Sequence, residues 1–253
     1  CSGSIKYMAL TDSLQAYWKF DEASGNAADS TANANTLTNT NTVAYAAAKI
    51  NNGADFEDDA TSRHFARTDA AQVGLDLTGN QSVSCWINLE SFASGANYYI
   101  ISKWASADGA YIYAVHNNAG TTRFNCALYN DANPSNNINY QINSVFSIAT
   151  WYHLVMTYNL TSETMTFYVN GSSVGTVQQL GQDTIHNSAG AFNVGGNVAI
   201  GGGFFDGIID ELGVWSREIS SSEVTTLYNG GAGLTHPFSV ATSGNNFFAF
   251  MPQ

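Results

Sequence analysis

The residues in this sequence best suited to chemistry are two groups of oxygen donors far apart in the chain. Asp21, Asn26 and Asp29 follow the first apolar run, and Asp210 and Glu211 lie within a late one. Carboxylate, amide and backbone oxygens suit calcium, which takes roughly six to eight of them. Aspartates in loops also cap turns, so Asp21 and Asp29 have a structural interpretation beside the metal one.

Two short motifs resemble enzyme signatures but lack the required context. Residues 171–175 match G-x-S-x-G, yet they follow a hairpin turn, whereas a nucleophile elbow joins a strand to a helix. The glycine run at 201–207 misses the spacing of a dinucleotide-binding loop, and no helix is predicted after it. We therefore assign no catalytic residue to either motif.

The predicted strands also lack the carboxylate pair that glycosidase chemistry needs. Such enzymes use two carboxyl groups about 5–9 Å apart, which on one strand face means residues two positions apart. Asp210 and Glu211 are adjacent and should point to opposite faces. His116 and Tyr113 have opposite parity as well, which does not suit a lyase. The sequence therefore favours a binding protein over an enzyme, with no catalytic residues.

Aromatic residues offer a different chemistry, the stacking of rings on sugars. Five of them lie close together in the sequence, at Tyr98, Tyr99, Trp104, Tyr111 and Tyr113. Aromatic rings also fill the cores of sandwiches, and that is the role expected for the tryptophans at 86, 151 and 215. Parity alone does not separate exposed rings from buried ones, so the ligand-binding residues stay unassigned.

Period-two alternation of apolar and polar residues indicates the elements that position these side chains. It recurs along the chain with turn residues between the runs, which is typical of a β-sandwich. Asn170-Gly171 predicts a two-residue hairpin turn. Residues 23–48 are too polar and irregular for a core element. The predicted strands cover 14–20, 82–89, 98–104, 110–116, 122–129, 138–144, 151–158, 163–169, 192–200 and 207–215.

One helix is predicted, directly after the last strand. Ser220 is a good N-cap, and Glu223 completes a capping box three residues later. Ile219 and Val224 flank the cap as a hydrophobic staple, and the glycines at 230–231 end the helix.

No repeat or linker divides the chain, so we predict one domain at 14–238. A leader or anchor precedes it at 1–13, and a Phe-rich tail at 239–253 forms an extra strand or contacts a partner. Cys1 could carry a lipid or a cross-link, or the segment before Met8 could be an addition.

The three cysteines cannot all pair within the chain and match no zinc-site spacing. Cys85 shares parity with Val83 and Ile87, and Cys126 shares parity with Phe124, so both should point into the core. A free buried thiol is the simpler interpretation, and a disulfide between neighbouring strands stays open.

Charge argues against two classes of partner. Eight Lys plus Arg residues face 20 Asp plus Glu residues, which gives a net charge of −12. A protein with so few cations cannot neutralise many phosphates, so nucleic acid and anionic membranes are poor partners. No apolar run is long enough to span a membrane. The acidic run at 57–59 either adds a metal ligand or forms a solvated turn.

Several segments together resemble the concanavalin A-like, laminin-G-like (pentraxin-like) domain family. They occur in family order over about residues 14–230. The likeness implies a two-sheet antiparallel jelly-roll sandwich in which the terminal strands are adjacent. The matching segments are Ala16–Asn26, Ser84–Asn88, Trp151–Tyr158, Phe167–Gly171 and Phe205–Trp215.

The resemblance also implies a structural calcium site. Adjacent terminal strands would bring Asp21 and Asp210 together as ligands, with Asn26 and Asp29 following from the same loop. The usual role of this domain is non-catalytic recognition of glycans or cell surfaces, outside the cell. Residues 8–60 resemble a variety found in phage and microbial surface proteins. The alternative is therefore a structural protein of a virion or filament, self-assembling through its leader or tail.

Overall fold

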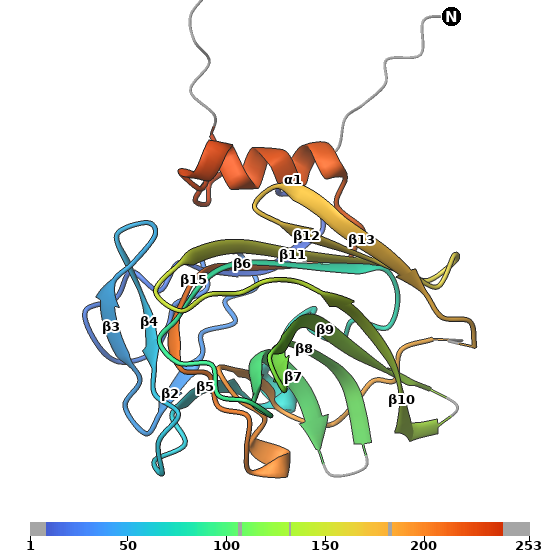
Figure 1. Ribbon diagram of the computed structural model, residues 1–253, viewed down its shortest axis with the longest axis horizontal. Coiled ribbons are helices and arrows are strands. Elements are labelled where there is room, and N and C mark those ends of the chain that lie inside the picture. The colour runs from blue at the N-terminus through green and yellow to red at the C-terminus, as the bar shows by residue number, and fades with distance from the viewer. Residues whose placement is uncertain (1–8, 106–107, 132, 182–183, 240–253) are drawn as a thin grey trace, which may run out of the picture.

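A computed structural model describes residues 9–105, 108–131, 133–181 and 184–239. Its strands form two antiparallel sheets packed face to face (Figure 1). The predicted all-β jelly-roll sandwich is confirmed. The first sheet has the order β13 (Ser172–Gln178), β12 (Thr164–Val169), β11 (Trp151–Asn159), β6 (Gln81–Leu89), β15 (Gly207–Trp215), β4 (Asn52–Phe56), β3 (Ala44–Ala47), with β1 (Leu14–Trp18) also paired to β15.

The second sheet has seven strands. Its order is β10 (Asn133–Asn143), β9 (Thr121–Asn130), β8 (Asp108–Asn118), β7 (Asn97–Ala105), β14 (Phe192–Val194), β5 (His64–Arg67), β2 (Thr38–Thr40). Short 3₁₀ turns η1 (Asp69–Ala71) and η2 (Val198–Ile200) lie in the loops, and η3 (Asn229–Gly231) follows the helix.

Alternation along β8 and β9 builds the core on one side and leaves a second surface on the other. Tyr113 on β8 pairs with Cys126 on β9, and both are fully buried between the sheets. Their strand neighbours Ala114 and Asn125 therefore face away from the core. The outward side of the seven-stranded sheet is consequently set by the residues of opposite parity.

The single α-helix of the described residues, α1 (Ser221–Tyr228), covers the outer side of the eight-stranded sheet (Figure 1). The predicted capping box is present, because Ser220 accepts from the Glu223 amide and the Glu223 carboxylate accepts from the Ser220 amide. The predicted staple pair, Ile219 and Val224, is buried in a cluster with Trp215. The helix therefore seals this face of the sandwich.

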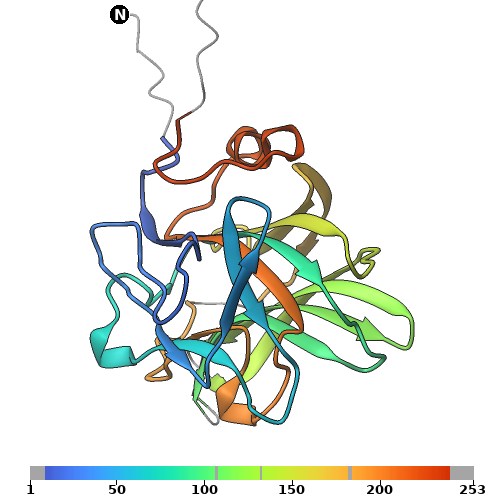
Figure 2. The ribbon, with the colours of Figure 1, turned by 90° about the vertical axis from the view of Figure 1, so that its left-hand side faces the viewer.

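The beginning of the described chain is tied to the last strand. The Trp215 indole donates to the Leu10 carbonyl at 2.7 Å, and Arg217 donates to the carbonyls of Ala9 and Asp12. β1 pairs with β15, as the family resemblance implied. Figure 2 shows the two described ends leaving on the same side of the molecule.

Several short elements differ from the sequence-based expectation. Residues 23–48 were expected to contain no core element, but β2 and β3 lie there and Leu37 and Val43 are buried. β4 and β5 were not predicted, and β14 ends at Val194 because the chain turns at Gly195, where φ is +81°. These strands are three to five residues long. A period-two pattern is hard to recognise over so few positions.

The remaining expectations concern the cysteines and the tryptophans, and the structure agrees with some of them and not with others. Cys85 and Cys126 are buried and free, so the disulfide alternative is wrong. Trp86 and Trp215 are buried as expected, although on the outer side beneath α1, but Trp151 is only half-buried. Cys1 and residues 240–253 lie outside the described residues. No described helix is long and apolar enough to cross a membrane.

Candidate functional site

The outer face of the seven-stranded sheet holds a hollow of about 410 Å³. It lies over β7, β8, β9 and β10, with η2 at one rim. Its lining combines aromatic rings, side-chain amides, one arginine and one histidine. The lining residues are Asn97, Tyr99, Trp104, Ile112, His116, Arg123, Asn125, Ala127, Tyr129, Asn139, Gln141, Asn197 and Ile200.

Stacked aromatic rings form one end of the hollow. The Trp104 and Tyr129 rings lie 6.2 Å apart between centroids, with 21° between their planes. Gly109 lies against both rings, and a Cβ there would come within 2.6 Å of atoms of each. Any larger residue at position 109 would therefore displace the stack. Ile112 and Ala127 pack against these rings in the same apolar cluster.

Polar side chains fill the other end because they alternate with core residues along β9 and β10. Arg123 and Asn125 come from β9, and Asn139 and Gln141 come from β10. The Arg123 Nη1 donates to Gln141 Oε1 at 3.1 Å. His116 pairs with Arg123 across β8 and β9, and burial, with help from the Arg123 charge, lowers its pKa.

Two lining residues carry buried polar atoms without hydrogen-bond partners among the described residues. Asn197 is fully buried, and both its Oδ1 and its Nδ2 are unpaired. The Trp104 Nε1 is buried and unpaired as well. An unsatisfied buried donor or acceptor costs about 1–3 kcal/mol. These atoms are closed to solvent, so a ligand's hydroxyl groups would offset that cost only after the covering side chains shift.

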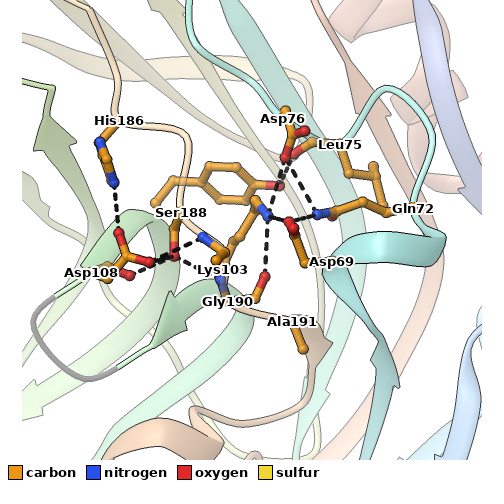
Figure 3. A network of polar contacts seen from close by, with 12 residues as sticks. Asp69, Gln72, Leu75, Asp76, Lys103, Asp108, His186, Ser188, Gly190 and Ala191 are labelled. Carbon is orange, nitrogen blue, oxygen red and sulfur yellow. Dashed lines mark hydrogen bonds and ion pairs between the residues drawn. The ribbon is translucent and has the colours of Figure 1, made fainter.

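A buried ionic network anchors the strand that carries Trp104 (Figure 3). Lys103 is fully buried, and its Nζ lies 2.6 Å from Asp69 Oδ1 and 3.1 Å from Asp76 Oδ1. The same ammonium donates to the Gly190 carbonyl at 3.1 Å. Three contacts to three segments fix the end of β7, and with it the backbone of Trp104.

Asp108 fixes the start of β8 in the same region (Figure 3). It contacts His186 Nε2 at 2.6 Å and accepts from the Ala189 amide at 3.0 Å. The other ring nitrogen of His186 lies 2.9 Å from Asp131. Burial alone lowers the pKa of His186, but the hydrogen bonds with Asp131 and Asp108 raise it above its ordinary value. The aromatic end of the hollow is thus held by charged contacts behind it.

The late acidic pair lies on β15, away from the hollow. Asp210 and Glu211 were expected to point to opposite faces, but the register shifts between Asp210 and Gly213, and Glu211 has a φ of +51°. This bulge brings the carboxyls close enough that Glu211 contributes to the pKa of Asp210. Burial raises the pKa of Asp210 to about 8 and that of Glu211 to about 7.

Of the predicted calcium ligands, Asp21 and Asp210 lie in one region. Asp21 raises the pKa values of Asp210 and Glu211, although burial is the larger cause. Asp210 Oδ1 and Glu211 Oε1 are buried without a described hydrogen-bond partner. Asp210 Oδ2 accepts from the Ile50 amide, and Asp21 accepts from the Asn52 amide. Carboxylate oxygens are ligands that calcium prefers, and Asp21, Asp210 and Glu211 lie in one region. They are not among the described acidic groups whose ligand atoms lie within 4.8 Å of one another.

Asn26 and Asp29 have other partners. The two oxygens of Asp29 accept from the amides of Tyr17, Thr31 and Asn35 and from the Thr31 hydroxyl. This is the turn-forming role that the sequence left open for this residue. Asn26 is exposed, and its Oδ1 accepts from the Asn39 amide at 3.0 Å.

The acidic run at 57–59 is divided between two surroundings. Glu57 joins Asp55 and Glu90, whose ligand atoms lie within 4.8 Å of one another. Asp59 pairs instead with Arg63 at 3.2 Å. Glu90 is exposed, so this acidic group faces solvent where β4 and β6 end.

The structure shows which of the clustered aromatic residues are buried and which line the hollow, a distinction that the sequence did not give. Tyr98, Tyr111 and Tyr113 are buried between the sheets, while Tyr99 and Trp104 are half-buried and line the hollow. The other lining residues were not assigned. The sequence did hold one usable signal for them. Cys126 was correctly placed in the core, so the residues of opposite parity on β9 had to face outward, namely Arg123, Asn125, Ala127 and Tyr129.

Comparison with known proteins assigns the family. A family model described as the concanavalin A-like lectin/glucanases superfamily matches residues 59–225, more than half of the chain. The chain therefore belongs to this superfamily, and the family expectation from the sequence is confirmed. No curated protein sequence matches the chain.

Solved structures share the fold at low sequence identity. The binding domain of Paraclostridial Mosquitocidal Protein 1 gives a TM-score of 0.66 at 13% identity, over 88% of this chain and 53% of that one. The botulinum neurotoxin serotype G binding domain gives 0.65 at 16%, over 85% and 50%. This chain thus spans about half the length of these toxin binding domains.

A third structure matches over nearly its whole length. Domain 4 of AbnA, a GH43 extracellular arabinanase from Geobacillus stearothermophilus, was solved in complex with arabinotriose. Its TM-score is 0.60 at 21% identity, over 84% of this chain and 96% of that one. Identities this low establish the fold alone.

Proposed function

We propose that this domain binds saccharides, without catalysis, in the hollow on the outer face of its seven-stranded sheet. One observation carries the proposal: the hollow contains a stacked aromatic pair, and two of its lining residues, Asn197 and Trp104, have unpaired polar atoms. Sugars offer both matching parts, hydroxyl groups for the polar atoms and C–H faces for the rings.

The comparisons support this use of the fold. Two of the similar structures are binding domains of toxins, and the similar arabinanase domain was solved with arabinotriose. We extend saccharide recognition to this chain as a proposal. Recognition of glycans on a cell surface, or from a virion surface, would place the domain outside the cell.

The lining of the hollow also supports binding over hydrolysis. Glycosidases use two carboxyl groups about 5–9 Å apart. None of the described residues that line the hollow is an aspartate or a glutamate. His153, another candidate for chemistry, is buried against Ser84 and Trp86, and burial lowers its pKa to about 3. It serves packing beneath α1.

A glycan array followed by calorimetry tests the proposal. Wild-type protein should bind a subset of oligosaccharides, and Trp104→Ala should weaken that binding at least tenfold. Trp151→Ala is the matched control, because Trp151 is also a half-buried tryptophan but lies on the other sheet. Binding that survives Trp104→Ala, or that fails equally in both variants, would contradict the proposed location.

We also propose a structural calcium ion held by Asp21 and Asp210. The buried oxygens of Asp210 and Glu211 without described partners support it. The ion would join the loop after β1 to β15 and would neutralise carboxylates that burial destabilises. The ion would stabilise the eight-stranded sheet, whose outer face α1 covers. It would not contact the saccharide.

The alternative function, a structural protein of a virion or filament, depends on the N-terminal leader and the Phe-rich tail. Both lie largely outside the described residues. Ordering of either segment upon self-assembly would support it, and this alternative stays a prediction.

A further inference from the structure

Charge is distributed unevenly between the hollow and the rest of the protein. The chain carries 20 acidic residues and only eight Lys plus Arg. The hollow reverses this balance, because its described lining includes Arg123 and no carboxylate. A binding surface with the opposite sign to its protein indicates which ligands it favours.

Arg123 differs from other arginines of the domain in its partners. Arg63 pairs with Asp59, Arg217 pairs with Glu223, and Arg67 donates to backbone carbonyls. Arg123 donates to the neutral Gln141, and among the described residues no carboxylate lies within ion-pair distance of it. A guanidinium has five N–H donors, so this one retains donors for an anion.

The cation is placed at a fixed position in the hollow. Gln141 holds the guanidinium from β10, and His116 lies opposite on β8. Burial and the Arg123 charge lower the pKa of His116, so the histidine is neutral near pH 7 and Arg123 supplies the positive charge. Arginine matches carboxylate and sulfate groups because its planar fork donates two parallel hydrogen bonds.

Tyr129 of the aromatic pair and Arg123 lie toward opposite ends of one strand. Arg123 and Tyr129 both belong to β9, six residues apart, which corresponds to about 20 Å along a strand. Asn125 lies between them on the same face. This length suits an oligosaccharide of several units, stacked at one end and paired through an anionic group at the other.

We infer that the hollow recognises an acidic oligosaccharide, with Arg123 pairing its carboxylate or sulfate group and Trp104 and Tyr129 stacking a ring. The inference rests on the proposed saccharide function and adds the chemical class of the ligand. The net charge of −12 repels anions at long range, so selectivity comes from the local contact at Arg123.

Paired oligosaccharides that differ only in charge test the inference. One arm uses oligogalacturonate and its methyl ester, and the other uses a sulfated oligosaccharide and its desulfated form, in calorimetry at constant salt. We expect the acidic member of at least one pair to bind tenfold or more tightly than its neutral partner. The arm that shows this preference identifies the anionic group.

A charge-matched pair of variants locates the preference. Arg123→Gln should abolish it, so that the acidic and neutral members bind with similar affinity. Arg63→Gln removes the same charge elsewhere and should leave the preference intact. Equal binding of acidic and neutral members by wild-type protein, or a preference that survives Arg123→Gln, would overturn the inference.

The outcomes also separate this inference from the function on which it rests. If neutral saccharides bind as well as acidic ones and Trp104→Ala abolishes both, saccharide binding stands and the acidic preference is wrong. If no member of either pair binds and the glycan array is blank, the proposed function itself is wrong. Unfolding midpoints of the variants confirm that each one is folded.

Discussion

Both sheets are built from alternating strands, but their outer faces differ in what covers them. The eight-stranded sheet is covered by α1, and Trp215, Val155 and Leu227 are buried beneath it. The outer face of the seven-stranded sheet holds the hollow, where Trp104 and Tyr99 remain half-exposed. In the covered face an aromatic ring stabilises the fold, whereas in the open face it is available to a ligand.

Polar atoms show the same difference. The Trp215 indole donates to the Leu10 carbonyl, while the Trp104 indole has no partner among the described residues. Folding has satisfied the first donor but not the second. On the proposed function, a bound saccharide would supply the missing partner at this face.

The largest expected effect is on the covered face. Trp215→Ala removes a fully buried ring and its hydrogen bond, so the free energy of unfolding should fall by about 3–5 kcal/mol. Urea titration measures this, and saccharide affinity of the folded variant should be unchanged. A loss below about 1 kcal/mol would mean that α1 does not seal this face.

Calcium gives the next largest effect. At roughly 100-fold excess over its dissociation constant the ion should add about 3 kcal/mol to the free energy of unfolding. Thermal unfolding in calcium and in chelator measures this, with Asp210→Asn expected to abolish the difference. Asp29→Asn is the control, because Asp29 forms a turn. Identical curves for wild-type protein in both buffers would reject the ion.

Lys103 tests the support behind the open face. Lys103→Met should cost about 2 kcal/mol, less than a fully buried pair, because Asp69 and Asp76 can regain water. Saccharide affinity should fall as well, since the network fixes the backbone next to Trp104. Loss of stability with full affinity would show that the network does not position the site.

The smallest effect concerns His186 at the edge of the hollow. Its folded pKa is raised, so its stabilising contribution is complete below the ordinary histidine pKa and is lost as pH rises through the folded pKa. The contacts are partly exposed, so the change should be under about 1 kcal/mol. Comparison of wild-type protein with His186→Asn between pH 5 and 9 should show a difference that shrinks with pH. A constant difference would rule out the ionic contribution.

Much of the fold could be predicted because the long strands alternate strictly. The run from Thr122 to Leu128 placed Cys126 in the core, and the capping box at Ser220 predicted the helix. Short polar strands such as Thr38–Thr40 gave no comparable pattern. Bulges were also hidden, and the one after Asp210 reversed the expected direction of a neighbouring side chain.

The candidate site was predictable only in part. Tyr99 and Trp104 were noted as possible stacking rings, but register shifts in β7 obscured which rings face outward. Asn197 gave no signal, because its burial without a partner depends on contacts between distant loops. The family resemblance implied that Asp21 and Asp210 lie in one region, as they do, whereas Asp29 accepts hydrogen bonds from its own turn.

Side-chain NMR of the two unpaired groups tests the saccharide site most directly. The five tryptophans give five indole signals, and those of Trp18 and Trp215 are internal controls because both indoles donate to buried carbonyls. Adding an oligosaccharide selected on the array should shift the Trp104 indole and the Asn197 side-chain amide and leave the controls in place. Shifts confined to Trp215 or Trp86, with Trp104 and Asn197 unmoved, would place binding on the covered face and contradict the account.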